Sequence, residues 1–84
     1  MFTAKIRVTL RSTILDPQGK AVEGSLKSLG FNAIIDTRIG KYMELKIDTE
    51  EKSEAENIAE QACRKLLANP VMENYEFEII NSDE

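Results

Sequence analysis

Histidine and tryptophan are absent from this chain of 84 residues, and cysteine occurs once. The lack of histidine removes the commonest general base and the commonest metal ligand of proteins. The lone Cys63 cannot form a disulfide within the chain, which agrees with a reducing compartment. The chain also lacks a long apolar run and the apolar core of a signal peptide. These absences argue against a metal enzyme, a disulfide scaffold and a membrane protein, and they predict a cytoplasmic location.

Basic residues are in the minority, with 11 Lys and Arg against 15 Asp and Glu and a net charge of −4. Phosphate binding normally requires a net basic face, so we do not expect a nucleic acid as partner. A hydrophobic share of 42% and a charged share of 31% are typical of a globular domain. We expect residues 1–84 to form one domain, with residues 81–84 as a short, flexible acidic tail.

Alternation of apolar and polar residues predicts four strands. The first covers residues 2–10, and the last covers residues 75–79. Between them, residues 31–39 and 43–47 alternate on either side of Gly40, where we expect a tight turn that makes the two runs a hairpin. In that interpretation, Gly40 supplies a positive φ.

The first helix is expected over residues 17–29 because Asp16 suits the N-cap and Pro17 suits the first helical position. Gly30 then supplies a left-handed stop. Gly19 is the anomaly, since a glycine in the first turn costs on the order of 1 kcal/mol relative to alanine. Simple capping, a bound anion or a close protein contact would each explain the glycine.

A second helix is expected over residues 54–68. Ser53 and Glu56 have the spacing of a capping box, and apolar residues then recur every three or four positions. Asn69 and Pro70 end this helix before the last strand. Cys63 lies within the apolar stripe, so it is expected to be a core residue and not a nucleophile.

The order βαββαβ predicts an α+β, ferredoxin-like fold: a four-stranded antiparallel sheet of order 4-1-3-2 with two helices on one face. The other face would carry charged side chains from the central and flanking strands, namely Lys5, Arg7, Arg11, Glu44, Lys46, Asp48, Glu76 and Glu78. This face could simply be solvated and crossed by weak ion pairs. Alternatively, an uncovered face and two free edges favour a homodimer or higher oligomer.

No pair of acidic residues has a spacing that requires a general acid and base. We therefore expect no catalytic, cofactor-binding or metal-binding residues in this chain. Arg38 and Lys41 flank Gly40, where they could be ordinary surface charges or contacts with an acidic partner.

Three runs are informative in combination: Leu15-Asp16-Pro17-Gln18-Gly19, Arg38-Ile39-Gly40-Lys41, and Leu66-Leu67-Ala68-Asn69-Pro70-Val71 before the strand that contains Tyr75. Together they resemble the PurS family, the small subunit of bacterial and archaeal phosphoribosylformylglycinamidine (FGAM) synthase. The resemblance extends over about residues 4–80, but residues 48–52 carry no family signal.

The resemblance implies a noncatalytic subunit of an ATP-dependent ligase in de novo purine biosynthesis. In such a complex a glutaminase subunit (PurQ) releases ammonia, and a synthetase subunit (PurL) uses ATP and magnesium to convert formylglycinamide ribonucleotide (FGAR) to FGAM. PurS-like subunits associate with themselves, bridge PurL and PurQ, and support ammonia transfer.

The positions carried over from the family are Asp16, Pro17, Gly19, Arg38, Gly40, Lys41, Asn69 and Pro70, which we assign to folding and partner contact. No cofactor is expected in this chain. The alternative function is a small-molecule-binding regulatory domain of ferredoxin-like fold, since such domains can pair and bind ligands between them.

Overall fold

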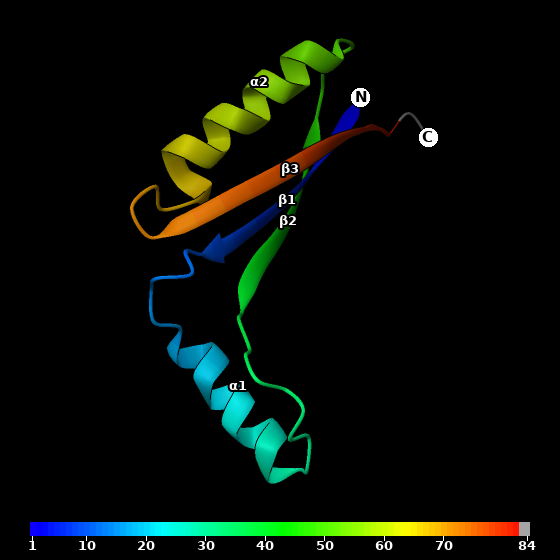
Figure 1. The fold of residues 1–84 in the computed structure, drawn as a ribbon. Coiled ribbons are helices and arrows are strands. Elements are labelled where there is room, and N and C mark those ends of the chain that lie inside the picture. The colour runs from blue at the N-terminus through cyan, green and yellow to red at the C-terminus, as the bar shows by residue number, and fades with distance from the viewer. Residues whose placement is uncertain (83–84) are drawn as a thin grey trace.

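A computed structural model describes residues 1–82, which form a three-stranded antiparallel sheet and two α-helices (Figure 1). The elements in chain order are β1 (Phe2–Leu10), α1 (Pro17–Ser28), β2 (Gly40–Ile47), α2 (Lys52–Ala62) and β3 (Glu73–Asn81). A π-helical turn, η1 (Cys63–Leu67), continues α2. Within residues 1–82, no helix is long and apolar enough to cross a membrane.

The strand order is β2-β1-β3, with β1 antiparallel to both neighbours. The alternation predicted for residues 2–10 is confirmed, because Ala4, Ile6 and Val8 are fully buried on one face. Ile6 lies opposite Met43 on β2 and Phe77 on β3, so these apolar residues share that face. On the other face, the Arg7 guanidinium pairs with the Glu76 carboxylate at 2.9 Å, as a solvated charged face would predict.

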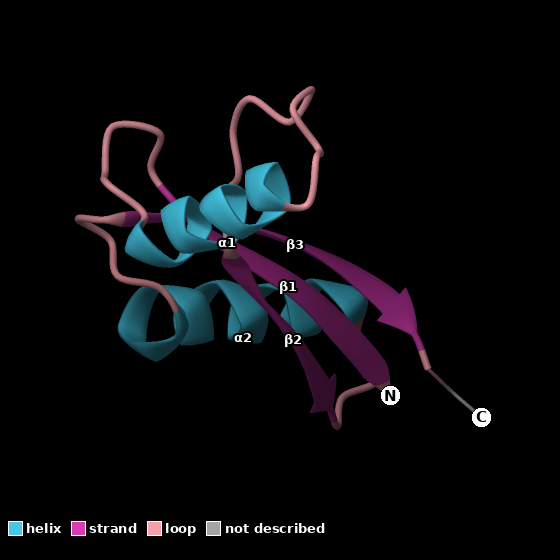
Figure 2. Cartoon of the chain, turned by 90° about the horizontal axis from the view of Figure 1, so that it is seen from below, coloured by secondary structure: helices cyan, strands magenta, loops and turns pink. Residues whose placement is uncertain are grey.

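Helix α2 crosses one face of the sheet, which we call the inner face (Figure 2). Ala55 and Ala59 of α2 and Cys63 at the start of η1 are all fully buried and belong to the same core as the apolar residues of β1. Small side chains on the helix let it approach the sheet closely, so the chain builds its core from one helix and three strands.

The four-stranded sheet of order 4-1-3-2 is wrong, because the predicted strand over residues 31–39 does not form. Residues 34–39 instead run directly into β2, and Gly40 is the first residue of that strand rather than a turn. The glycine is needed for space and not for a positive φ, because a Cβ here would lie 2.5 Å from the Val8 carbonyl oxygen. Without a reversal at Gly40, the preceding segment cannot fold back onto β2.

The prediction that both helices cover one face is also wrong. Residues 12–39, which we call the arm, contain α1 and project from the end of the sheet (Figure 1). The radius of gyration of the Cα atoms is 16.4 Å, whereas a compact domain of this length should have about 12 Å. The chain is therefore elongated, with extents of 50 × 31 × 14 Å.

The ends of α1 agree closely with the prediction. Asp16 is the N-cap, Pro17 is the first helical residue, and Gly30 has a φ of 95° just after the helix. No contact between α1 and a strand of the sheet is extensive in the described chain, and much of the apolar side of the arm is exposed to solvent. The exposed apolar residues of the arm are Leu15, Val22, Leu29, Phe31 and Ile35.

Helix α2 begins earlier than predicted, and its capping box does not form. Glu51 is the N-cap, Ser53 lies inside the first turn, and no side chain caps the helix. Thr49 organises this start instead: its hydroxyl donates to Glu54 at 3.1 Å and accepts from the N–H of Glu51 at 3.4 Å. At the other end of the chain, β3 continues through Asn81 into the predicted tail, and Asp83 and Glu84 lie outside the described residues.

Candidate partner-binding site at the base of the arm

Asp16 joins the helix of the arm to the sheet. One carboxylate oxygen accepts a hydrogen bond from the N–H of Gly19 at 2.9 Å, and the other accepts from the N–H of Ile39 at 2.8 Å. The two bonds, that from Ile39 first, lower the pKa of Asp16 below its ordinary value, and the positive charge of Arg38 acts in the same direction. Asp16 is thus both a helix cap and a bridge to the residue before β2.

At Gly19, α1 lies close against the returning chain. A Cβ at this position would collide with the backbone carbonyl of Thr37 and would also come within 2.7 Å of the Asp16 carboxylate. The room that the sequence predicts at this turn is therefore occupied by the arm's own backbone. This contact leaves no space for an anion among the groups that Asp16 already caps.

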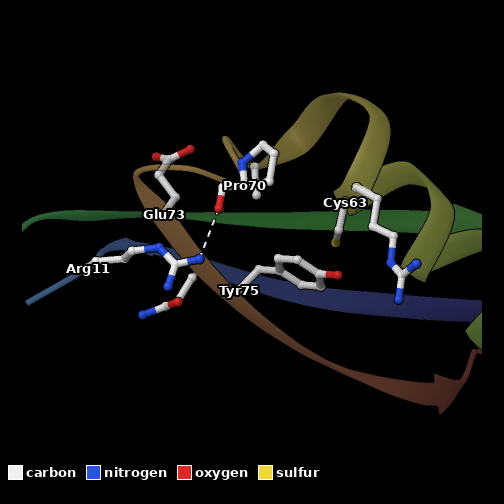
Figure 3. A pocket seen from close by; sticks show the side chains of 8 residues that line it. Arg11, Cys63, Pro70, Glu73 and Tyr75 are labelled. Atoms are coloured by element: carbon white, nitrogen blue, oxygen red, sulfur yellow. Dashed lines mark hydrogen bonds between the residues drawn. The ribbon is translucent and has the colours of Figure 1, made fainter.

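Arg38 and Arg11 form the next link. The Arg38 guanidinium donates to the carbonyl oxygens of Arg11 at 2.7 Å and Leu10 at 3.3 Å, where β1 ends. Arg11 in turn donates through its own guanidinium to the carbonyl oxygen of Pro70 at 2.9 Å, the dashed line in Figure 3. Two cationic side chains therefore tie the arm to β1 and β1 to the loop before β3.

Glu73 provides a second connection. Its carboxylate lies 3.7 Å from the Lys41 ammonium and accepts a 2.7 Å hydrogen bond from the N–H of Asn69. The Asn69 side chain also accepts from the N–H groups of Val71 at 2.9 Å and Met72 at 3.3 Å, which forms the turn into β3. This side chain–backbone bonding is the usual reason for asparagine in such a turn.

All positions that the sequence singles out thus gather at one end of the sheet, although they come from three separate runs. Sequence reasoning missed the two residues that connect them, Arg11 and Glu73. Arg11 is not on the charged face of the sheet as predicted, because β1 ends one residue before it. Glu73 could have been found from the sequence. It lies two residues before Tyr75 and four before Phe77, so in a strand it shares their face of the sheet, where a charged residue is unexpected.

Two hollows flank this network. One, of about 440 Å³, lies between η1 and β3 and is lined by Arg11, Cys63, Arg64, Ala68, Pro70, Glu73, Asn74 and Tyr75 (Figure 3). The other, of about 380 Å³, is lined by Leu10, Asp16, Gln18, Ile39, Gly40, Lys41 and Glu73. Glu73 lines both hollows.

Several side chains that line the first hollow are buried or bonded to other residues of the chain. Cys63 is fully buried, and burial, together with the nearby negative charge of Glu60, raises the pKa of its thiol. The Tyr75 hydroxyl and the Arg64 guanidinium both bond to the Glu60 carboxylate, each at 3.1 Å. Among residues 1–82, no group of three Cys, Asp or Glu side chains could hold a metal ion. The arrangement is suited to fixing backbone segments in place.

The family model for PurS, described as phosphoribosylformylglycinamidine (FGAM) synthase, matches residues 3–81. The chain belongs to the PurS family. The PurS subunit of phosphoribosylformylglycinamidine synthase from Bacillus subtilis is 43% identical over 79 residues, which cover 94% of this chain and 93% of that protein. The PurS subunit from Mycobacterium leprae is 49% identical over 76 residues, with coverages of 89% and 91%.

Solved PurS structures share the elongated fold. The B. subtilis PurS structure superposes with a TM-score of 0.86 at 42% identity, covering 96% of this chain and all of that one. A chain in the structure of PurLQS from Thermotoga maritima superposes with a TM-score of 0.85 at 35% identity, covering 94% and 96%. The similarity to these PurS structures covers the projecting arm as well as the sheet, so the arm belongs to the family fold.

Proposed function

We propose that this PurS-family chain is a noncatalytic assembly subunit of FGAM synthase. It acts in purine biosynthesis by holding a glutaminase and an ATP-dependent synthetase together, so that ammonia released from glutamine reaches FGAR. The observation that carries this proposal is the family match over residues 3–81, and the hydrogen bonds that tie the arm to the sheet are in keeping with it. The presence of a similar chain in PurLQS supports the choice of partners.

In this proposal the chain associates with itself and contacts PurL- and PurQ-type subunits in the cytoplasm. ATP and magnesium bind to the synthetase and not to this chain. The base of the arm serves assembly indirectly: its internal bonds fix the direction of the arm, and exposed residues such as Lys41 and Pro70 are left to meet a partner.

Co-elution with the two partner subunits tests the assembly role. The chain, mixed with synthetase and glutaminase in the presence of glutamine, Mg²⁺ and ATP, should elute with both on size exclusion. A Lys41→Glu variant should co-elute at least about tenfold more weakly, whereas Lys65→Glu, which changes the same charge on exposed η1, should bind like the natural chain. Failure of the natural chain to co-elute with either subunit would remove the proposal.

Because Arg38 is hydrogen-bonded within the chain, a variant at this position would not test partner contact alone. Because its guanidinium holds the Arg11 carbonyl, Arg38→Glu would disturb the arm as well as any partner contact. Lys41 is therefore the cleaner probe, since its ion pair with Glu73 is long, at 3.7 Å, and its side chain is exposed.

A further inference from the structure

The hollow between η1 and β3 has the size of a small-molecule site. Its volume is about 440 Å³, and ligand pockets in proteins usually measure about 300–1,000 Å³. Buried Cys63 and Ala68 supply an apolar part of the lining. The ring of Tyr75 adds a flat apolar surface, which lies between Arg11 and Cys63 (Figure 3). The hollow therefore offers cover for the carbon body of a small organic molecule.

The lining of this hollow carries more positive than negative charge. Arg11 and Arg64 are its cations, and within the described chain Glu73 is its acidic residue. The Glu73 carboxylate is already engaged by the Lys41 ammonium and by the N–H of Asn69. The chain as a whole has a net charge of −4, so a cationic hollow is a local departure from the acidic composition.

Both guanidinium groups keep hydrogen-bond donors that the chain does not use. A guanidinium presents several N–H donors in a fixed fork. Arg11 donates to the Pro70 carbonyl oxygen at 2.9 Å. Arg64 donates through Nε to the Glu60 carboxylate at 3.1 Å and also interacts with the Tyr75 hydroxyl. Among residues 1–82 the other N–H groups of these two side chains have no partner, and both side chains are exposed.

The Tyr75 ring separates the two cations. Its hydroxyl donates to Glu60 at 3.1 Å, and the same carboxylate oxygen accepts from Arg64, so Arg64 belongs to the hydroxyl end of the ring. Arg11 lies at the opposite end, where the Tyr75 side chain leaves β3 (Figure 3). A molecule that lies along the ring would therefore meet a guanidinium group at each of its ends.

The π-helical turn η1 forms one wall of the hollow. The N–H of Ala68 donates to the Cys63 carbonyl oxygen at 3.1 Å, which is the wide bonding pattern of a π-helix. Such turns are rare and are frequently found at functional sites. Cys63 and Arg64 of the turn, and Ala68 directly after it, all line the hollow. The irregular end of the helix thus coincides with the cationic lining.

We propose that the hollow between η1 and β3 binds a small organic dicarboxylate, whose carbon body covers the Tyr75 ring and whose carboxylates meet Arg11 and Arg64. Carboxylates match the planar fork of a guanidinium group. A compact anion such as phosphate would reach only one of the two cations, and a cationic ligand would be repelled by both. This site is additional to the proposed assembly role and does not depend on it.

Isothermal titration of the full chain with simple acids tests the class of ligand. Adipate and terephthalate carry a carboxylate at each end of a carbon body, whereas hexanoate and benzoate carry one only. At least one diacid should bind at one site per chain, at least about tenfold more tightly than the matching monoacid. The proposal fails if neither diacid binds at millimolar concentration, if each diacid binds only as tightly as its monoacid, or if inorganic phosphate binds as tightly as the diacids.

A pair of neighbouring cations tests the position of the ligand. The Arg64 side chain is 66% exposed, so Arg64→Gln should keep the circular dichroism of the natural chain. This variant should bind the diacid at least about tenfold more weakly. Lys65→Gln removes the same charge from the next residue of η1, which does not line the hollow, and should bind like the natural chain. Equal affinities of the two variants would overturn the proposed position.

Arg11→Gln tests the other end of the hollow. Because the Arg11 side chain also holds the Pro70 carbonyl, the fold of this variant is first checked by circular dichroism. A folded Arg11→Gln chain should lose the preference for a diacid over its monoacid, and a preference that persists would contradict the two-ended site. Failure of the titrations would leave the assembly role standing, since co-elution with the synthetase and the glutaminase is measured separately.

Discussion

The carboxylate of Asp16 accepts a 2.8 Å hydrogen bond from the backbone N–H of Ile39, across 23 residues of sequence. This bond closes the arm at its base, since it joins the start of α1 to the residue before β2. The Gly19 N–H bonds to the same carboxylate, and the Gly19 backbone packs against Thr37. The direction of the arm is thus determined where these segments meet.

Acid should loosen this junction. The hydrogen bonds from Ile39 and Gly19 hold the pKa of Asp16 below its ordinary value, so the ionised form stabilises the fold. This stabilisation is present at neutral pH and is lost as the pH falls below about 4 and through the lowered pKa. At pH 7 the melting temperature of Asp16→Asn should be lower than that of the natural chain. Between pH 7 and pH 3 it should then fall by less than the melting temperature of the natural chain does. Parallel curves would contradict a role for this carboxylate.

Alanine substitutions at two glycines of α1 should change the stability of the protein in opposite directions. Gly19→Ala places a methyl group against the Thr37 carbonyl and should destabilise the protein by about 1–3 kcal/mol. In Gly24→Ala the new Cβ meets no atom within 4 Å beyond the neighbouring backbone of its own helix, and the better helix propensity of alanine should stabilise the protein by up to about 1 kcal/mol. Urea unfolding measures both, and equal effects at the two positions would show that Gly19 is not a packing contact.

Loss of the Arg38 side chain should free the arm without unfolding the sheet. Arg38→Met removes the bonds to the Leu10 and Arg11 carbonyls, which should weaken the attachment by about 1 kcal/mol. Hydrogen exchange should then quicken over residues 12–39, while β1 and β3 keep their protection. A uniform increase over the whole chain would mean that Arg38 stabilises the fold globally.

Cys63 should react slowly in the folded protein. It is fully buried at the start of η1, and burial raises the pKa of its thiol, so little thiolate is present at pH 8. An aromatic disulfide reagent should modify the native chain at least about tenfold more slowly than the urea-unfolded chain. Fast modification of the native protein would place the thiol in an accessible site.

The local elements could be predicted because their determinants are local. The alternation of residues 2–10 and the Asp16-Pro17 start each depend on neighbours in sequence, and β1 and α1 form there as expected. The arrangement of residues 31–39 could not be predicted in the same way. A period of two indicates an extended backbone, but it does not say whether the pairing edge lies in the same chain.

The sequence indicates several residues of the candidate site but does not show that they lie together. Asp16, Arg38 and Asn69 stand in runs that resemble the family, but their common location depends on where β1 ends and on the chain running straight through Gly40. The connecting role of Arg11 follows from that end point, because its guanidinium then reaches the Pro70 carbonyl. Such contacts arise from tertiary structure and leave no spacing signal.

The rate of FGAM formation in a reconstituted synthase tests the central claim most directly. Synthetase and glutaminase are assayed with ATP, Mg²⁺ and FGAR, with and without this chain, first with glutamine and then with an ammonium salt as nitrogen source. The chain is expected to raise the glutamine-dependent rate at least about tenfold while leaving the ammonium-dependent rate nearly unchanged, because it contributes assembly and not chemistry. Equal glutamine-dependent rates with and without the chain would contradict its role as an assembly subunit.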